Sequence, residues 1–260
     1  MSETAVFTAR DGRFVAGARA RGPWDPGAPQ GGAPAALLMR AFERLDGAGG
    51  LVLARVTYEF LRPVPLGELS VEAAVSRPGR RVQLLEGAIT TSDGVEVVRA
   101  RALRVAAADA GGLTSGDDAG VPPGPEHGVD NRMVPPHRPM FAPDAIEIRF
   151  VAGAFGGGPA TAWFRLRHAI VAGEEPSALQ RLAAAGDFGN GISATLSWDD
   201  YVFINPDLTL YVEREPVGEW IALQSRTIIA AEGIGTAESV LYDERGRVGR
   251  ALQALLVARR

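Results

Sequence analysis

The sequence lacks cysteine and lysine altogether, and each absence removes a class of chemistry. Without cysteine the chain has no disulfide, no thiolate nucleophile and no thiolate ligand for a metal ion. Without lysine it cannot form a Schiff base with a carbonyl substrate, and the lysine of a P-loop is missing as well. The 27 basic residues are therefore all arginine, and 31 acidic residues outnumber them. This mildly acidic balance argues against nucleic acid as a partner.

Long apolar runs are also absent. No stretch approaches the roughly 18 apolar residues that a membrane-spanning helix needs. Hydrophobic residues make up 46% of the chain, as in an ordinary globular protein. The opening residues, MSETAVFTARDG, lack the basic region and the apolar core of a secretory signal. We therefore expect a soluble, cytoplasmic protein without a membrane partner.

Histidine is scarce, and two of the three histidines, His127 and His137, fall within residues 106–142. This segment is dense in glycine, proline and aspartate and has no apolar periodicity, which is typical of a linker. A general base has to be held within hydrogen-bond reach of its substrate, so we interpret both histidines as surface residues. The third, His168, has no partner motif. We expect neither a metal site nor another cofactor.

Two stretches of the chain are nearly the same text. Residues 57–69 read TYEFLRPVPLGEL, and residues 209–220 read TLYVEREPVGEW. Thr57 corresponds to Thr209, and after one skipped residue a proline, a glycine and a glutamate also correspond, at offsets of 152 and then 151. A chain of 260 residues is long enough for two domains of about 130 residues each. The repeat therefore indicates two related halves.

Both halves follow the same order of predicted elements. Each opens with a hairpin pattern, around the turn signal Asp11-Gly12 in the first half and within residues 146–170 in the second. One amphipathic helix comes next, over residues 31–45 and again over residues 175–188, where Ser177 can cap it. Alternating antiparallel strands follow, over 53–64, 69–79, 82–94 and 95–105 in the first half and over 201–215, 220–233, 234–246 and 247–259 in the second.

This order resembles the hotdog fold, in which an antiparallel sheet wraps around one helix. We therefore predict an α+β double hotdog, with two antiparallel sheets each wrapped around a long central helix. The N-terminal hotdog is expected over residues 1–105, the linker over 106–142 and the C-terminal hotdog over 143–260. Because long strand edges invite pairing, we also expect a homodimer.

Three polar residues interrupt apolar text in the second half. Gln253 lies on an otherwise apolar strand face, where an amide without partners would destabilise the fold by about 1–3 kcal/mol. Asn205 precedes a proline, which restricts it to an extended conformation and so fixes the direction of its side chain. Asp187 ends the second helix, where the helix dipole disfavours a carboxylate. At the offset of 152, Arg101 stands in place of Gln253 and Leu53 in place of Asn205, so the first half has no equivalent set.

Each of the three residues also has a plain structural interpretation, which the sequence leaves open. Asp187 can start a turn, Asn205 can form an Asx turn and Gln253 can bind a backbone group. The asymmetry between the halves favours function when the three are taken together. A serine hydrolase is disfavoured, because the serine of GISAT, from Gly191, lacks the following glycine of a nucleophile elbow.

The whole chain resembles the double-hotdog acyl-CoA thioesterases of the thioesterase II type. The motifs that carry the resemblance are PQGGAPAALLMRA and YEFLRPVPLGE in the first half, and GDFGNGIS, FINPDLTLYVEREPVGEW and DERGRVGRALQALLV in the second. In that family an aspartate on the second helix, a threonine or serine on the next strand and a glutamine on the last strand hold the hydrolytic water. The first matches Asp187 and the last Gln253, whereas the hydroxyl position falls on Asn205, a departure from the family pattern. Thr209 matches the hydroxyl only in a different register.

The resemblance implies that the chain hydrolyses acyl thioesters of CoA or acyl carrier protein to free acid and thiol, in fatty-acid metabolism. Asp187 would activate the water, and Asn205 and Gln253 would hold it. The N–H groups of Gly31 and Gly32 at the first helix are candidates to bind the carbonyl oxygen, although a plain turn into the helix explains these glycines equally. The alternative is a double hotdog that binds acyl thioesters without cleaving them, or a structural subunit. A hotdog dehydratase is disfavoured because no suitably placed histidine is visible.

Overall fold

The computed structural model describes residues 5–47, 49–108, 112, 120–130 and 139–260. The first half contributes strands β1 (Ala5–Arg10), β2 (Arg13–Ala16), β3 (Leu51–Phe60), β4 (Gly67–Arg77), β5 (Val82–Thr91) and β6 (Glu96–Ala106). The second half contributes β7 (Ile146–Ala152), β8 (Ala160–Leu166), β9 (Ala169–Val171), β10 (Tyr201–Ile204), β11 (Asp207–Val212), β12 (Trp220–Ile229), β13 (Ile234–Asp243) and β14 (Gly246–Arg259).

These strands form one continuous sheet. Their order is β7-β8-β12-β13-β14-β11-β3-β6-β5-β4-β2-β1-β9, and β10 also pairs with β14. Neighbours along this path are antiparallel except β1 and β9, which are parallel. The predicted hairpin β1–β2 is present, with Asp11 and Gly12 both at positive φ in its turn, as a tight primed turn requires.

The two halves are joined where the two strands that carry the repeated sequence, β3 and β11, pair with each other. β3 and β11 are antiparallel neighbours in which Thr57 lies opposite Thr209, and Thr209 Oγ1 donates to Thr57 Oγ1 at 3.1 Å. The register runs outward symmetrically from this pair, with Val56 opposite Leu210. The repeat therefore marks the centre of the molecule.

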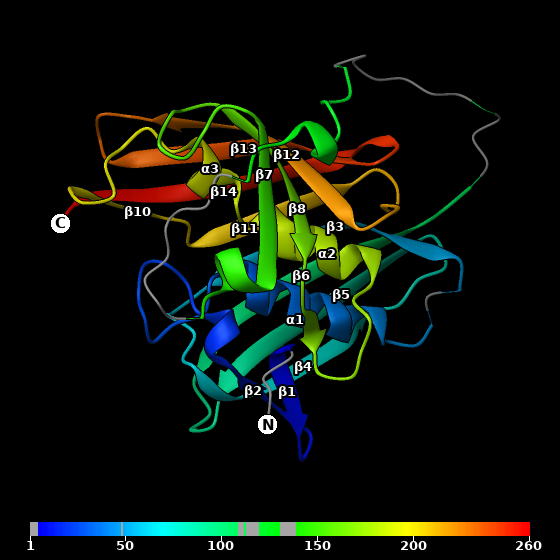
Figure 1. Ribbon diagram of the computed structural model, residues 1–260. Coiled ribbons are helices and arrows are strands. Elements are labelled where there is room, and N and C mark those ends of the chain that lie inside the picture. The colour runs from blue at the N-terminus through cyan, green and yellow to red at the C-terminus, as the bar shows by residue number, and fades with distance from the viewer. Residues whose placement is uncertain (1–4, 48, 109–111, 113–119, 131–138) are drawn as a thin grey trace.

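The helices lie between the strands of the two halves, where α1 (Gly32–Glu43) and α2 (Ala178–Gly186) are side by side (Figure 1). α1 packs against β4, β5 and β6, and α2 packs against β8 and β12. Nearly every side chain of α1 is buried, because one face meets the sheet and another meets α2. Ser177 caps α2 as predicted, its Oγ accepting the N–H of Gln180 at 3.0 Å.

The structure differs from the predicted fold in three respects. The sequence predicts two sheets, whereas the pairing of β3 with β11 joins the strands of both halves in one. The second helix is shorter than predicted, because it ends at Gly186 and a separate short helix, α3 (Gly189–Ser193), follows. Pro206, which has no N–H to donate, lies between β10 and β11 and so divides the predicted strand 201–215.

Part of the predicted linker 106–142 packs on the second half. Trp163 Nε1 donates to the carbonyl of Pro123 at 2.7 Å, and Val129 and Phe150 exchange two backbone hydrogen bonds of 2.9 Å. A short 3₁₀ turn, η2 (Pro125–His127), lies between these contacts, and η3 (Phe141–Ala145) leads into β7. A further 3₁₀ turn, η1 (Ala18–Ala20), precedes α1 in the first half.

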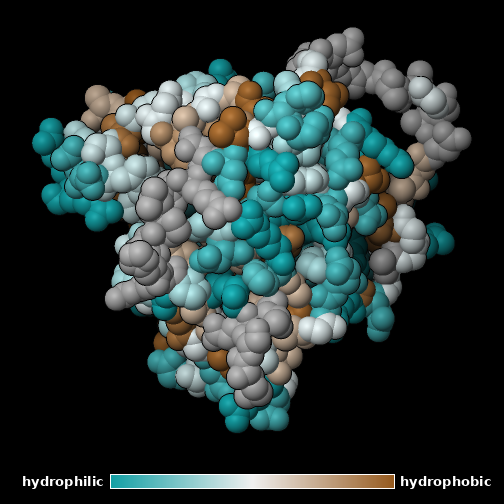
Figure 2. All heavy atoms as spheres, in the orientation of Figure 1, coloured by the Kyte–Doolittle hydropathy of each residue, from teal (hydrophilic) through white to brown (hydrophobic). Residues whose placement is uncertain are grey.

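Hydrophilic residues cover most of the face seen in Figure 2. His127 is exposed on the surface, as predicted, and His137 lies outside the described residues. Within the described part of the chain, no helix is long and apolar enough to cross a membrane. No three histidine, aspartate or glutamate side chains in that part are placed to hold a metal ion. The end strands of the sheet are β7 and β9, and a homodimer formed through such edges stays a prediction.

Candidate active site

A cavity of about 560 Å³ lies between the first residues of α1 and the loop from β10 to β11. Both halves contribute to its wall, which is mostly apolar. The apolar lining includes Pro34, Phe60 and Val64 from the first half and Phe155, Phe188 and Ile204 from the second. The polar residues Asp187, Asn190 and Asn205 also line the cavity. Such a cavity suits a ligand with a large apolar part and one polar group to be oriented.

Asp187 is held by groups from both halves. Its Oδ2 accepts the N–H of Gly32 at 2.9 Å, and its Oδ1 accepts a hydrogen bond from Nδ2 of Asn205 at 2.9 Å. The sequence predicts an unfavourable dipole, because the residue follows the last turn of α2. The structure corrects this expectation: the carboxylate lies at the N-terminus of α1, the end at which a helix dipole favours an anion.

Burial controls the acidity of this carboxyl group, since Asp187 is only 7% exposed. Burial raises the pKa of Asp187 from 3.8 to about 6, although hydrogen bonds from Asn205, Gly32 and Gln30 act in the opposite direction. A carboxylate of this pKa is largely ionised at pH 7 and is more basic than an exposed aspartate. These are the properties of an effective general base.

Gln253 lies beside Asp187, as the sequence predicts, but protein groups occupy its amide. Its Nε2 donates to the backbone carbonyl of Asp187 at 3.1 Å and to the carboxylate at 3.4 Å. Its Oε1 accepts the N–H of Asn190 at 3.0 Å. The structural interpretation, a side chain that binds backbone groups, is therefore correct, and these bonds fix the turn between α2 and α3.

Asn205 also meets the carboxylate, and its amide makes a second bond. Nδ2 donates to Asp187 Oδ1 and to the backbone carbonyl of Asp207, the latter at 3.0 Å. The local turn and the contact with the aspartate thus coexist. Thr209, the alternative for this position, instead bonds to Thr57 at the joint between the halves.

The two glycines that precede and begin α1 differ in what their N–H groups can do. The N–H of Gly32 already binds Asp187, that of Ala33 donates to the carbonyl of Gln30 at 2.9 Å, and Pro34 has none. Within the described residues the N–H of Gly31 has no acceptor, and Gly31 lines the cavity. Of the two predicted donors for a carbonyl oxygen, the structure therefore leaves Gly31.

Both glycines are needed for close packing at the site. A Cβ on Gly31 would lie 2.8 Å from Oδ1 of Asp187, and a Cβ on Gly32 would lie 2.4 Å from the carbonyl oxygen of Ala184 in α2. Neither contact leaves room for a side chain. The approach of α1 to the carboxylate and to α2 thus depends on Gly31 and Gly32.

Sequence reasoning missed Asn190. Its Nδ2 donates to the carbonyl of Phe203 at 2.8 Å, while its Oδ1 is buried without a hydrogen-bond partner. Asn190 stands in GDFGNGIS, one of the motifs that carry the family resemblance, and this position could have identified it. A polar residue between glycines is, however, typical of a loop. In the structure it connects Gln253, on the last strand, to β10.

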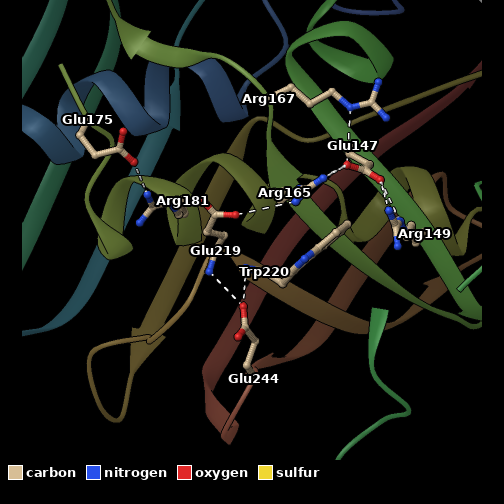
Figure 3. Close-up of polar contacts among 9 residues, drawn as sticks. All are labelled: Glu147, Arg149, Arg165, Arg167, Glu175, Arg181, Glu219, Trp220 and Glu244. Atoms are coloured by element: carbon tan, nitrogen blue, oxygen red, sulfur yellow. Dashed lines mark hydrogen bonds and ion pairs between the residues drawn. The ribbon is translucent and has the colours of Figure 1, made fainter. Parts of the chain in front are cut away.

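A cluster of charges borders the cavity at Glu147 and Arg167 (Figure 3). The buried carboxylate of Glu147 accepts hydrogen bonds from Arg149 and Arg165, each at 2.8 Å, and Arg167 Nε lies 3.6 Å away. Burial raises the pKa of Glu147, but the hydrogen bonds from Arg165 and Arg149 outweigh burial and hold this pKa below its usual range. Arg149 and Arg165 also lie over the ring of Trp220, at 4.9 and 4.8 Å from its centroid.

Two family models match this chain. The acyl-CoA thioesterase N-terminal domain matches residues 20–105, and the acyl-CoA thioesterase C-terminal domain matches residues 118–257. Among curated proteins, none matches the chain.

Solved structures resemble the chain over nearly its whole length. A protein from Thermobifida fusca YX described as a thioesterase II has a TM-score of 0.72 at 19% identity, covering 99% of this chain and 97% of its own. A hot dog protein of unknown function from Alicyclobacillus acidocaldarius has a TM-score of 0.73 at 18% identity, with coverage of 99% and 97%. The acyl-CoA thioesterase II TesB2 of Mycobacterium marinum has a TM-score of 0.67 at 15% identity, with coverage of 99% and 96%. At these identities the likeness shows the fold, which is the hotdog fold.

Proposed function

The chain belongs to the acyl-CoA thioesterase family and is a thioester hydrolase, and from this premise we propose that water activated by Asp187 cleaves its substrate. One observation carries the proposal. A buried carboxylate with a pKa of about 6 lies in the wall of an apolar cavity, oriented by Gly32 and Asn205. A base of this strength, held in one direction, can take a proton from water at neutral pH.

In the proposed reaction Asp187 accepts a proton from water as the water oxygen attacks the thioester carbonyl carbon. The carbon–sulfur bond then breaks, and the proton passes from Asp187 to the departing sulfur, which leaves as a thiol. A thioester is reactive enough that no covalent enzyme intermediate is needed, in keeping with the absence of cysteine from the chain. Gln253 acts by holding the turn that carries Asp187, and Asn205 by orienting Oδ1.

The negative charge that develops on the carbonyl oxygen also needs a donor. Gly31 supplies one in this proposal, because its N–H is available at the N-terminus of α1 and the residue lines the cavity. The dipole of α1 adds to the stabilisation. The acyl chain then lies against the apolar lining, and the cavity volume of about 560 Å³ would limit its length.

The test is release of free thiol from acyl-CoAs of increasing chain length. Turnover of at least one member of the series is expected, and its dependence on length measures the acyl pocket. If no member of the series releases thiol while CoA thioesters still bind, the protein is an acyl-thioester-binding double hotdog and the proposed hydrolysis is wrong.

Gln253→Leu is expected to reduce both stability and turnover. The substitution leaves the N–H of Asn190 and the carbonyl of Asp187 without partners, which costs about 1–3 kcal/mol in the free energy of unfolding. It should lower kcat less than loss of the carboxylate, since Gln253 only positions it. Urea unfolding and kcat on the same preparation measure the two effects. An unchanged kcat would show that the turn needs no support from the last strand.

Asn205→Thr restores the hydroxyl of the family pattern. A threonine hydroxyl can both donate to Asp187 Oδ1 and accept from water, so we expect kcat within about tenfold of wild type, whereas Asn205→Val removes the donor and should lower kcat further. Valine is the matched control because it has the shape of threonine. Equal activity of the threonine and valine variants would remove residue 205 from the site.

We propose further that the chain consists of two related hotdog units, residues 1–105 and 143–260, joined by residues 106–142. Three observations support this division. β5 and β13 have the same length at an offset of 152, and the repeated strands β3 and β11 pair symmetrically. Each unit also brings one principal helix to the centre.

A further inference from the structure

The repeated text contains one arginine in each half, and the two arginines have different surroundings. Arg214 forms a bidentate ion pair with the buried carboxylate of Asp243, with both Nη–Oδ distances at 2.6 Å. Its counterpart at the offset of 152 is Arg62, and the counterpart of Asp243 is Thr91. Thr91 carries no charge and bonds within its own turn, to Val95.

Arg62 therefore lacks an acidic partner at the position that corresponds to Asp243. Within the described residues it has no ion-pair partner, it is exposed, and it lines the cavity that contains Asp187. An unpaired guanidinium at a cavity wall is available to a ligand. Guanidinium groups are always charged and match a phosphate in geometry.

A second arginine reaches the same cavity from the other half. Arg167 follows β8, and its contact with Glu147 is made through Nε at 3.6 Å. The dashed line to Glu147 in Figure 3 starts from this Nε and from neither terminal nitrogen. Arg149 and Arg165 neutralise Glu147 by shorter bonds, and Arg165 also lies 3.8 Å from Glu219. Three guanidinium groups thus face two carboxylates, so the cluster keeps one positive charge in excess.

We propose that Arg62 and Arg167 bind phosphate on the thiol-bearing carrier of the substrate, while the apolar wall binds the acyl chain. This inference rests on the proposed hydrolysis of acyl thioesters. The shared chemistry is a phosphorylated pantetheine arm, which occurs both in CoA and on an acyl carrier protein. Asp25 and Asp130 also line the cavity, so the anion is bound at the two arginines and not along the cavity edge as a whole.

The experiment compares one acyl chain on carriers of decreasing charge: CoA, 4′-phosphopantetheine, pantetheine and N-acetylcysteamine. In Arg62→Gln we expect KM for acyl-CoA to rise about tenfold with kcat unchanged, and about tenfold again when Arg167→Gln is added. KM for acyl-pantetheine and acyl-N-acetylcysteamine should not change. Arg101→Gln is the matched control, since Arg101 is exposed, pairs with Glu86 and does not line the cavity.

The arms of the experiment separate the sources of the phosphate. A rise in KM shared by acyl-CoA and acyl-phosphopantetheine assigns the arginines to the phosphate next to pantetheine, which a carrier protein also presents. A rise confined to acyl-CoA assigns them to the phosphates of the nucleotide. An equal rise on the uncharged carriers, or no rise on any carrier, overturns the proposal.

A binding measurement makes the result independent of turnover. Calorimetric titration with CoA, which has no thioester to hydrolyse, should show a Kd about tenfold weaker in Arg62→Gln than in wild type and in Arg101→Gln. Turnover of acyl-N-acetylcysteamine by the wild type tests hydrolysis alone, because that substrate has no phosphate. Failure of the hydrolysis and failure of the phosphate site therefore give different results. An unchanged Kd for CoA contradicts the arginine site even if every thioester is cleaved.

Discussion

The Asp187→Asn variant is expected to lose about 10²–10⁴-fold in kcat while KM stays near its wild-type value. The carboxylate lies in the cavity wall with both oxygens oriented, so its replacement removes the base without changing the shape of the cavity. An amide cannot accept the proton of the attacking water. Steady-state thiol release on the best acyl-CoA measures both constants, and wild-type kcat in the variant would show that the base lies elsewhere.

The same variant is expected to unfold less readily than the wild type at pH 8. The pKa of Asp187 is about 6 in the folded protein and 3.8 unperturbed, so folding favours the protonated form. Its contribution to stability is complete below pH 3.8 and is lost as pH rises through 6. A shift of about two pKa units corresponds to about 3 kcal/mol. The neutral amide of the variant recovers only part of this free energy, because its own N–H faces the N–H donors of Asn205 or Gly32. Urea unfolding at pH 4 and pH 8 measures the difference.

The pH dependence of turnover provides an independent check. Wild-type kcat should fall about tenfold per pH unit below pH 6, as the base becomes protonated. Asp207→Asn is the control, because burial raises the pKa of Asp207 as well, yet its side chain caps the N–H of Ala254 and does not line the cavity. This variant should keep the wild-type pH profile. If its profile shifts as that of Asp187→Asn does, the titration does not identify the base.

Gly32→Ala is expected to reduce the free energy of unfolding by about 2–4 kcal/mol and to lower kcat. The new methyl group would lie 2.4 Å from the carbonyl oxygen of Ala184, so α1 and α2 must separate. Overpacking of this kind costs about 1–3 kcal/mol, and a lost bond to a charged group costs about 1.5–3 kcal/mol. The gain from placing alanine in a helix, about 0.5–1 kcal/mol, is smaller than either.

The matched control for this substitution is Gly191→Ala in α3. A Cβ at Gly191 meets nothing within 4 Å. The free energy of unfolding of the Gly191→Ala variant should therefore equal or slightly exceed that of the wild type. Urea denaturation of both variants measures the effect. Equal stability of Gly32→Ala and the wild type would show that the two helices can adjust their distance freely.

The local elements could be predicted from the sequence because their signals are local. Asp11-Gly12 marks a hairpin and Ser177 a helix cap, and both are in place. The apolar pattern singled out Asp187, Asn205 and Gln253, and the resemblance to the thioesterase family implied that they lie together, as the structure places them.

The partners of these groups could not be predicted, because they are distant in sequence. The N–H that binds Asp187 comes from Gly32, 155 residues away, and reverses the expected effect of the helix dipole. The joining of both halves in one sheet depends on a free edge of β3 meeting a free edge of β11, which a strand pattern does not specify. Asn190 was missed because neighbouring glycines hide the burial of its side chain.

The pairing of Thr57 with Thr209 has a consequence for cooperativity. β3 and β11 are central strands, so neither half can melt without exposing a row of backbone groups on the other. Heating should therefore give a single calorimetric transition for the whole chain, and not one transition per half. Either half expressed alone would present an open central edge and should self-associate, which makes the covalent connection a safeguard against exchange of strands between molecules.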